Sequence, residues 1–272
     1  MAGASEVGMV GALVAAGVRP DLVVGTSVGA INGVAVAADP TPAAADRLLE
    51  IWTGLGASDV FASGPLRAIR TFARHGHLHS AQPLRDLLGR YIPQASIEEL
   101  PVPFQCVAAS IERASARWFT KGPLVDAVLA SCAVPGLLPP VEIDGEHFVD
   151  GGIVDSIPVG RAVSRGAKTV FVLHAGRVEQ PLRPPQRPWE TALVAFEIAR
   201  RHRFAEEVAT LPDGVRIHIL PTGADHTASV PIRYRDTSGV RVRIERARAA
   251  TATYLARNLN PDPDPARDGA AG

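Results

Sequence analysis

The sequence lacks the features that indicate nucleic-acid binding or an oxidising compartment. Its 272 residues balance 28 Lys and Arg against 28 Asp and Glu, so no net positive charge favours nucleic-acid binding. There are two cysteines, Cys106 and Cys132, without CxxC spacing. This usage excludes a disulfide framework and indicates reduced, buried thiols of a cytoplasmic protein.

Long apolar runs are also missing. No stretch approaches the roughly 18 apolar residues that a membrane-spanning helix needs. The first residues, MAGASEVGMV, have neither the basic segment nor the apolar segment of a signal peptide. Three histidines, His75, His77 and His79, alternate in a polar segment, which favours a solvated loop over a metal site. We therefore expect no transmembrane segment, no signal peptide, no metal and no cofactor.

What the sequence does contain is an alternation of helical and strand patterns. With 46% hydrophobic residues, it can build one large domain, which we place at residues 1–258. Helices are predicted over residues 4–16, 26–38, 42–56, 81–91, 123–132, 158–165, 190–209 and 239–257. Strands are predicted at 22–24, PFQCVAASI, ARWFT, VEIDGEHFVD (a hairpin with an Asp-Gly turn), 170–173 and VRIHIL. This order predicts an α/β fold with a largely parallel sheet, and the apolar-poor residues 259–272 are expected to be a disordered tail.

The first motif is Gly25-Thr26-Ser27-Val28-Gly29, a GxSxG sequence between a predicted strand and a predicted helix. In this setting the motif makes a sharp turn that presents the serine as a nucleophile. We expect Gly25 and Gly29 to be glycines because side chains two residues from the serine would collide with neighbouring backbone. The turn puts Ser27 at a helix N-terminus, so the Val28 N–H is a candidate oxyanion donor.

The base that would activate Ser27 has two candidate sources. One is a histidine of a Ser-His-Asp triad, with His174, His218 and His226 as candidates. Too few strands precede Ser27 for the usual fold of such hydrolases. The other source is Asp150, which ends a predicted strand before Gly151 and Gly152, although Asp-Gly-Gly is also a common turn.

These segments together resemble the patatin-like phospholipase family. The matching pieces are PDLVVGTSVGAINGVAVAADP, VLASCAVPGLLPPVEIDG and FVDGGIVDSIPV, and the likeness spans residues 3–175, in the manner of bacterial members. The resemblance implies a three-layer α/β fold with a mainly parallel sheet and helices on both faces. It implies a Ser-Asp dyad in which Ser27 attacks fatty acyl esters of phospholipids or other lipids and Asp150 takes its proton directly, without metal. We expect Asp150 to be ionised with an ordinary pKa near 4.

The family's third motif, a glycine-rich oxyanion loop after a first strand, is represented here by its last glycine alone, Gly3. The preceding glycines and strand are missing from this chain, which predicts either a coding start further upstream or a shortened paralogue. Each missing oxyanion donor would cost about a hundred- to a thousandfold in rate. The alternatives to a dyad hydrolase are therefore an impaired or non-catalytic lipid- or partner-binding paralogue, and a generic esterase with a Ser-His-Asp triad.

Two further surfaces bear on lipid binding. Trp52 and Phe61, with the apolar residues of 60–72, either border an acyl groove or pack in the core. The last helix carries five arginines, which predict either peripheral contact with an anionic membrane or a solvated face. These are Arg241, Arg243, Arg246, Arg248 and Arg257.

Overall fold

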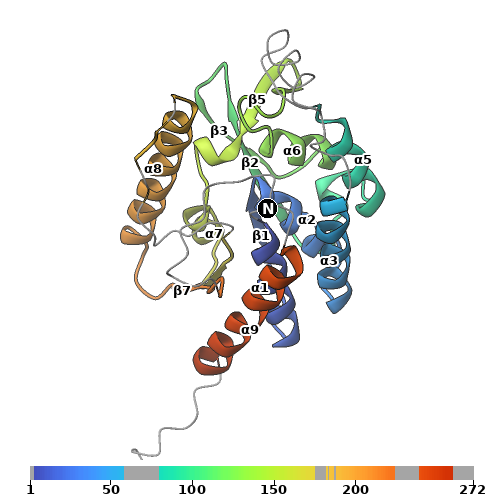
Figure 1. Cartoon of the computed structure of the whole chain (residues 1–272), viewed down its shortest axis with the longest axis vertical. Helices are drawn as coiled ribbons and strands as arrows, with labels where there is room; N and C mark the ends of the chain where they lie inside the picture. The colour runs from blue at the N-terminus through green and yellow to red at the C-terminus, as the bar shows by residue number, and fades with distance from the viewer. Residues whose placement is uncertain are drawn as a thin grey trace, which may run out of the picture.

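A computed structural model describes residues 3–57, 80–174, 182, 184–186, 188–223 and 239–259. The helices are α1 (Ala4–Ala15), α2 (Val28–Ala38), α3 (Pro42–Ala57), α5 (Gln82–Tyr91), α6 (Leu124–Ser131), α7 (Val159–Ser164), α8 (Pro188–Ala209) and α9 (Val240–Leu259), with short 3₁₀ turns η2 (Ile97–Glu99) and η3 (Gly151–Ile153). The strands are β1 (Val23–Thr26), β2 (Phe104–Ser110), β3 (Ser115–Phe119), β4 (Val141–Ile143), β5 (Glu146–Asp150), β6 (Thr169–Val172) and β7 (Arg216–Ile219) (Figure 1).

The central feature is β2, whose seven residues are all buried. One edge of β2 pairs with β3 over residues 106–110. Because residues 106–107 also pair with β1 and residues 108–110 also pair with β5, both β1 and β5 lie on the other edge. β1 runs parallel to β2 and β5 runs antiparallel to it, so the C-terminal ends of β1 and β5 meet along one edge of β2.

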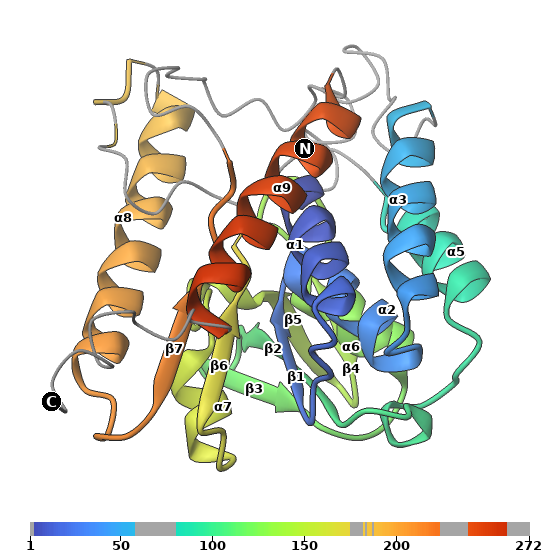
Figure 2. The same ribbon diagram turned by 90° about the horizontal axis from the view of Figure 1, so that it is seen from below.

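Helices cover both faces of this sheet. On one face, Phe104 lies against Gly33 of α2, since a Cβ placed on that glycine would lie 3.4 Å from the Phe104 ring. On the other face, the next residue, Gln105, accepts a hydrogen bond from Arg161 of α7 at 2.7 Å. Successive side chains of a strand point to opposite faces, so α2 and α7 lie on opposite sides of β2. Figure 2 shows the helices around the sheet from below.

The helix that precedes β1 packs closely against the last helix of the chain. A Cβ added to Gly8 of α1 would lie 2.1 Å from the backbone oxygen of Ile244 in α9, so this crossing requires glycine. α9 turns Ile244, Ala247, Thr251 and Leu255 inward, and the two helices lie side by side in both views (Figures 1 and 2). The two ends of the described chain therefore support the same part of the core.

The predicted α/β class, with helices on both faces, is confirmed, and so are the predicted helices and strands that fall on described residues. Parallel pairing joins β1 to β2 and β6 to β7. The β2–β3 and β4–β5 hairpins and the β2–β5 pair are antiparallel, as short turns between consecutive strands require for hairpins. Within the described residues, no helix combines the length and the apolarity needed to cross a membrane.

Candidate active site

Ser27 lies at a sharp turn between β1 and α2. Its φ is 54° and its ψ is −124°, a conformation that residues with a side chain rarely adopt. Such strain costs about 1–3 kcal/mol and persists where the surrounding structure fixes it. The conformation lifts the Ser27 hydroxyl out of the strand and directs the chain into α2, as the GxSxG motif predicts.

The two glycines of this motif have different surroundings. A Cβ on Gly25 would lie 2.5 Å from the backbone oxygen of Gly29 and 2.7 Å from Cα of Ala30, so β1 and the first turn of α2 require glycine there. A Cβ on Gly29 would meet nothing within 4 Å. The expectation that both glycines prevent a backbone collision is therefore correct for Gly25 and wrong for Gly29. A side chain at position 29 would instead enter open space.

Ser27 and Asp150 are brought together by the strand register. Thr26 pairs with Val107, and Asp150 pairs with the next residue of β2, Ala108. The Ser27 hydroxyl donates a hydrogen bond to Oδ2 of Asp150 at 2.5 Å. The serine thus contacts the carboxylate directly, without an imidazole between them, and this is the contact that a Ser-Asp dyad requires.

Asp150 is buried, with 2% of its surface exposed. Its second oxygen, Oδ1, accepts a hydrogen bond from the Gly152 N–H at 2.7 Å. Burial raises the pKa of Asp150 to about 6, while the hydrogen bonds from Ser27 and Gly152 lower it. The expectation of an ordinary pKa near 4 is therefore wrong, because it left out the cost of placing a carboxylate in a dry site.

The Gly-Gly pair after Asp150 has a steric and a polar role. A Cβ on Gly151 would lie 2.1 Å from the carbonyl oxygen of Val107, at the point where β1 and β5 meet beside β2. A side chain would therefore push β5 away from this junction. The Gly152 N–H holds the Asp150 carboxylate, as noted above. Asp150-Gly151-Gly152 is thus more than a turn, because it fits the carboxylate into the junction.

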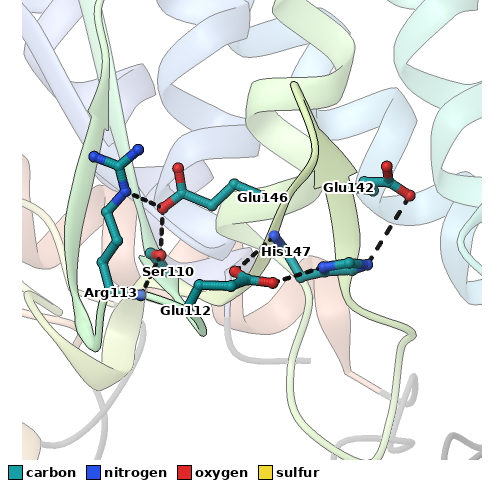
Figure 3. Close-up of polar contacts among 6 residues, drawn as sticks. All are labelled: Ser110, Glu112, Arg113, Glu142, Glu146 and His147. Atoms are coloured by element: carbon teal, nitrogen blue, oxygen red, sulfur yellow. Dashed lines mark hydrogen bonds and ion pairs between the residues drawn. The ribbon is translucent and has the colours of Figure 1, made fainter.

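Strand β5 is anchored at its other end by a polar cluster (Figure 3). The Glu146 carboxylate accepts a hydrogen bond from the Ser110 hydroxyl and pairs with Nε of Arg113 at 3.0 Å. The Glu112 carboxylate accepts a hydrogen bond from the backbone N–H of His147 at 2.9 Å and contacts Nδ1 of its ring at 2.7 Å. These contacts join the β2–β3 turn to the β4–β5 hairpin, and so fix the strand that carries Asp150.

The predicted oxyanion residues Gly3 and Val28 are neighbours. A Cβ on Gly3 would lie 2.4 Å from Cγ2 of Val28, so the beginning of α1 lies against the beginning of α2 beside Ser27. The N–H of Val28, the first residue of α2, has no acceptor within its own helix. Two helix N-termini, with their partial positive charge, therefore converge near the serine.

Behind these N-termini lies a buried polar network that sequence reasoning missed. Nδ2 of Asn32 donates to the Glu6 carboxylate at 2.7 Å and to the Gly3 carbonyl at 3.2 Å. Nε1 of Trp52 donates to Oδ1 of Asn32 at 2.8 Å. Burial raises the pKa of Glu6 to about 7. Trp52 is buried with a satisfied indole N–H, so of its two predicted roles the structure supports packing in the core. Phe61 lies outside the described residues.

Of the three candidate histidines of the alternative triad, the structure describes His174 and His218. His218 stacks on Phe171 with ring centroids 4.9 Å apart and lies 3.2 Å from the Tyr254 hydroxyl. His174 follows β6. His226 and the His75, His77 and His79 group lie outside the described residues. So does the predicted tail from residue 260 on, while its first residue, Leu259, still belongs to α9. In the part of the chain that the structure describes, no group of three metal-ligating side chains is found.

Both cysteines are buried and free, as predicted. Cys106 lies on β2, at the position that pairs with Gly25 of β1. Cys132 follows α6 and its thiol contacts the Ser27 carbonyl oxygen at 3.1 Å. The neighbouring Ser131 hydroxyl accepts a hydrogen bond from the Ser27 N–H at 2.9 Å. Both residues belong to the segment VLASCAVPGLLPP, whose resemblance was evident in the sequence but whose contacts were not.

Comparisons with known proteins show which family the chain is similar to. A family model described as patatin-like phospholipase matches residues 1–163. An uncharacterized NTE family protein of Mycobacterium bovis is 41% identical over 76 residues, which is 28% of this chain and 20% of that protein. Lysophospholipase nte1 of Emericella nidulans is 28% identical over 182 residues, 65% of this chain and 11% of that protein. The chain therefore spans about a fifth or less of the length of these relatives.

Among solved structures, VipD from Legionella pneumophila is similar to 93% of this chain and 64% of its own, with 15% identity and a TM-score of 0.44.

Proposed function

Because this chain belongs to the patatin-like phospholipase family, we propose that it is a serine acyl hydrolase that cleaves fatty acyl esters of phospholipids or other lipids. The observation that carries the proposal is the 2.5 Å contact between Oγ of Ser27 and Oδ2 of Asp150. The similarity to lysophospholipase nte1 of Emericella nidulans supports this substrate class.

In the first step, Oγ of Ser27 attacks the ester carbonyl carbon and passes its proton to Oδ2 of Asp150. A serine hydroxyl is a weak nucleophile until a base takes this proton. Asp150 serves as that base above its pKa of about 6, where the carboxylate is ionised. The pKa shift helps, because a carboxylate that is a stronger base takes the proton more readily.

The negative charge that forms on the carbonyl oxygen would be stabilised by the Val28 N–H at the beginning of α2. Gly3 brings the N-terminus of α1 to the same place, since it lies against the Val28 side chain. Hydrogen-bond donors fixed in this way act on the transition state more than on the ground state. The tetrahedral intermediate then collapses, the leaving alcohol takes the proton from Asp150, and the acyl group remains on Ser27.

In the second half of the reaction, a water molecule passes a proton to Asp150 and attacks the acyl carbonyl carbon. The second tetrahedral intermediate expels Ser27, which recovers its proton from Asp150, and the fatty acid leaves. The open space at Gly29, where a Cβ would meet nothing within 4 Å, gives a bulky acyl ester room to approach Ser27. No metal takes part in this scheme, because the two residues perform every proton transfer.

We also propose that α9 contacts anionic membrane surfaces. Its inward face packs against α1, while Arg241, Arg246, Arg248 and Arg257 are exposed. Val242, on the outer face of the same helix, is 51% exposed. Exposed guanidinium groups on a helix that also exposes an apolar side chain suit a surface of anionic head groups, where a lipid hydrolase finds its substrate.

A set of active-site variants distinguishes the dyad hydrolase from a triad esterase and from a non-catalytic binding paralogue. In hydrolysis assays with phospholipids and short acyl esters, the dyad predicts that Ser27→Ala and Asp150→Asn each lose nearly all activity. His174→Ala, His218→Ala and His226→Ala should each retain it. A triad esterase would lose activity with one histidine variant and tolerate Asp150→Asn. A lipid- or partner-binding paralogue would hydrolyse no ester, and vesicle binding would be independent of Ser27.

A further inference from the structure

Three consecutive residues at the end of α6 hold the backbones of both dyad residues. The Ser131 hydroxyl accepts a hydrogen bond from the Ser27 N–H at 2.9 Å. The Cys132 thiol donates to the Ser27 carbonyl oxygen at 3.1 Å. The Ala133 carbonyl oxygen accepts a hydrogen bond from the Asp150 N–H at 2.9 Å. From these contacts we infer that residues 131–133 form a positioning clamp that sets the distance between Ser27 and Asp150.

Ser27 needs such a clamp because its backbone is strained. At a φ of 54° its N–H and C=O have left the ladder of β1, whose last pair is Thr26 with Val107. The Ser27 carbonyl also accepts a hydrogen bond from the Ala30 N–H at 2.8 Å, which begins α2. The N–H has Ser131 as its acceptor, so Ser131 stabilises the strained turn where the helix cannot.

The clamp is dry, which strengthens its effect. Ser131 and Ala133 are fully buried, and 5% of Cys132 is exposed. Removing the Ser131 hydroxyl would leave a backbone N–H without an acceptor away from water, which costs more than an ordinary exposed hydrogen bond. Burial, together with the charge of Asp150, raises the pKa of the Cys132 thiol well above its usual value. The thiol therefore keeps its proton and can donate a hydrogen bond to the Ser27 carbonyl oxygen.

The clamp is also attached to a rigid support. α6 packs on the face of β2 that α2 covers, and Leu124, Val128 and Leu129 are buried in the main core. Near its N-terminus, Asp126 pairs with Arg85 of α5 at 2.5 Å. Because α6 is held in the core, the three hydrogen bonds from its end fix the backbones of Ser27 and Asp150 relative to the same helix.

The clamp residues do not touch the reacting atoms, so they are positioning residues for the dyad. The inference rests on the proposed hydrolase function. It predicts that Ser131→Ala lowers kcat about tenfold or more, equivalent to about 1.4 kcal/mol, with KM changed by less than about twofold. Cys132→Ala should lower kcat by about two- to fivefold, because S–H is a weaker donor. Cys132→Ser keeps a donor and should recover most of that loss.

The pH profile adds a readout that a merely structural role would not move. The hydrogen bond from Ser27 lowers the pKa of Asp150. If Ser131→Ala lets Ser27 move away, the pKa of Asp150 rises and the acidic limb of the kcat profile shifts to higher pH. The matched control is Thr251→Val, which removes a buried hydroxyl of α9 that donates to the Pro221 carbonyl oxygen, away from the dyad. This variant should keep the wild-type kcat and pH profile.

Each outcome decides the matter. Folded Ser131→Ala and Cys132→Ala variants with wild-type kcat and pH profile would overturn the clamp, as would an equal loss of kcat in the Thr251→Val control. If Ser131→Ala does not fold, the comparison of Cys132→Ala with Cys132→Ser decides, and equal kcat values for these two would refute the clamp. A Ser27→Ala variant as active as wild type would overturn the proposed function, and the clamp with it.

Discussion

Ser27 and Asp150, 123 residues apart in sequence, form a direct 2.5 Å hydrogen bond because the ends of β1 and β5 meet on one edge of β2. The carboxylate in this bond is buried, and its pKa is raised to about 6. The base must be ionised to accept the Ser27 proton. We therefore expect kcat to be constant above about pH 7 and to fall about tenfold per pH unit below about 6.

Asp155 provides the control for this profile. Its backbone carbonyl oxygen accepts a hydrogen bond from the hydroxyl of Thr26, next to Ser27. Its carboxyl also has a raised pKa, about 7, because of burial and the nearby Glu207 carboxylate. Asp155→Asn should leave the acidic limb near pH 6. Activity that stays constant down to pH 4.5, or a limb that disappears in Asp155→Asn, would contradict the assignment of the limb to Asp150.

Replacing Asp150 should separate activity from stability. Asp150→Asn removes the base and should lower kcat by about a thousandfold or more. It also removes a carboxylate whose folded-state pKa lies above its unfolded value of 3.8. The cost of that buried charge is fully present above about pH 6 and disappears as the pH falls toward 3.8. In urea unfolding at pH 8 the variant should therefore be more stable than wild type by about 1–3 kcal/mol.

The difference in stability between Asp150→Asn and wild type should shrink at pH 4.5, where Asp150 is mostly protonated in the folded state. A variant less stable than wild type at pH 8 would mean that the hydrogen bonds of the carboxylate outweigh its burial cost.

The two glycines of the GxSxG motif should respond differently to the same substitution. Gly25→Ala places a methyl group 2.5 Å from the Gly29 carbonyl oxygen and should prevent the turn from forming. Gly29→Ala has free space and lies in the first turn of α2, so it should keep the thermal unfolding temperature or raise it, since alanine favours helices by about 0.5–1 kcal/mol. If an acyl ester uses the space at Gly29, KM for long-chain esters should rise while the protein stays folded. Equal destabilisation by both substitutions would contradict this account.

Glu6 should make stability depend on pH. Its folded-state pKa is raised from 4.5 to about 7 by burial, so the neutral form is favoured in the folded protein. Protonation stabilises the fold below about pH 4.5, and that contribution is lost as the pH rises through 7. Glu6→Gln keeps an acceptor for Asn32 without the charge. Its stability relative to wild type should increase by about 2 kcal/mol between pH 5 and pH 8.5.

Urea unfolding of wild type and Glu6→Gln at both pH values measures this change. A constant difference between the two proteins would show that Glu6 has the same charge at both.

Membrane contact by α9 is tested with vesicles. The exposed Arg241, Arg246, Arg248 and Arg257 predict co-sedimentation with phosphatidylserine-containing vesicles, weaker binding to phosphatidylcholine vesicles, and a loss of binding at high salt. Replacing these four arginines by Gln should reduce binding to the phosphatidylserine-containing vesicles. It should not lower the hydrolysis of a soluble short-chain ester. A control replacement of Arg113 and Arg117, which are exposed on the β2–β3 hairpin, should have no such effect.

Much of this fold could be predicted because its local signals are strong. The Asp144-Gly145 pair predicted a hairpin turn, and both residues have positive φ, 53° and 77°. Gly17, which directly follows the predicted helix over residues 4–16 and suits its C-terminal end, has a φ of 77°. In each case the conformation depends on the residue itself and its immediate neighbours, which a sequence pattern records.

The site was predicted less completely, because its remaining parts depend on pairing between distant segments. Glu6 lies between Ser5 and Val7 in α1, and a helix with a single apolar face would leave its carboxylate exposed. It is buried because α2, α3 and α9 all pack around α1. The Ser131 and Cys132 contacts with Ser27 likewise follow from where α6 ends relative to β1, which local patterns do not encode.

The most direct test of the central claim is covalent labelling of this chain with a fluorophosphonate, followed by peptide mass spectrometry. The account predicts one phosphonylated residue, Ser27, with labelling that slows in proportion to the protonation of Asp150 below about pH 6 and is nearly lost in Asp150→Asn. Folded protein that stays unlabelled, or a Ser27 that reacts as fast in Asp150→Asn as in wild type, would contradict a Ser27–Asp150 dyad.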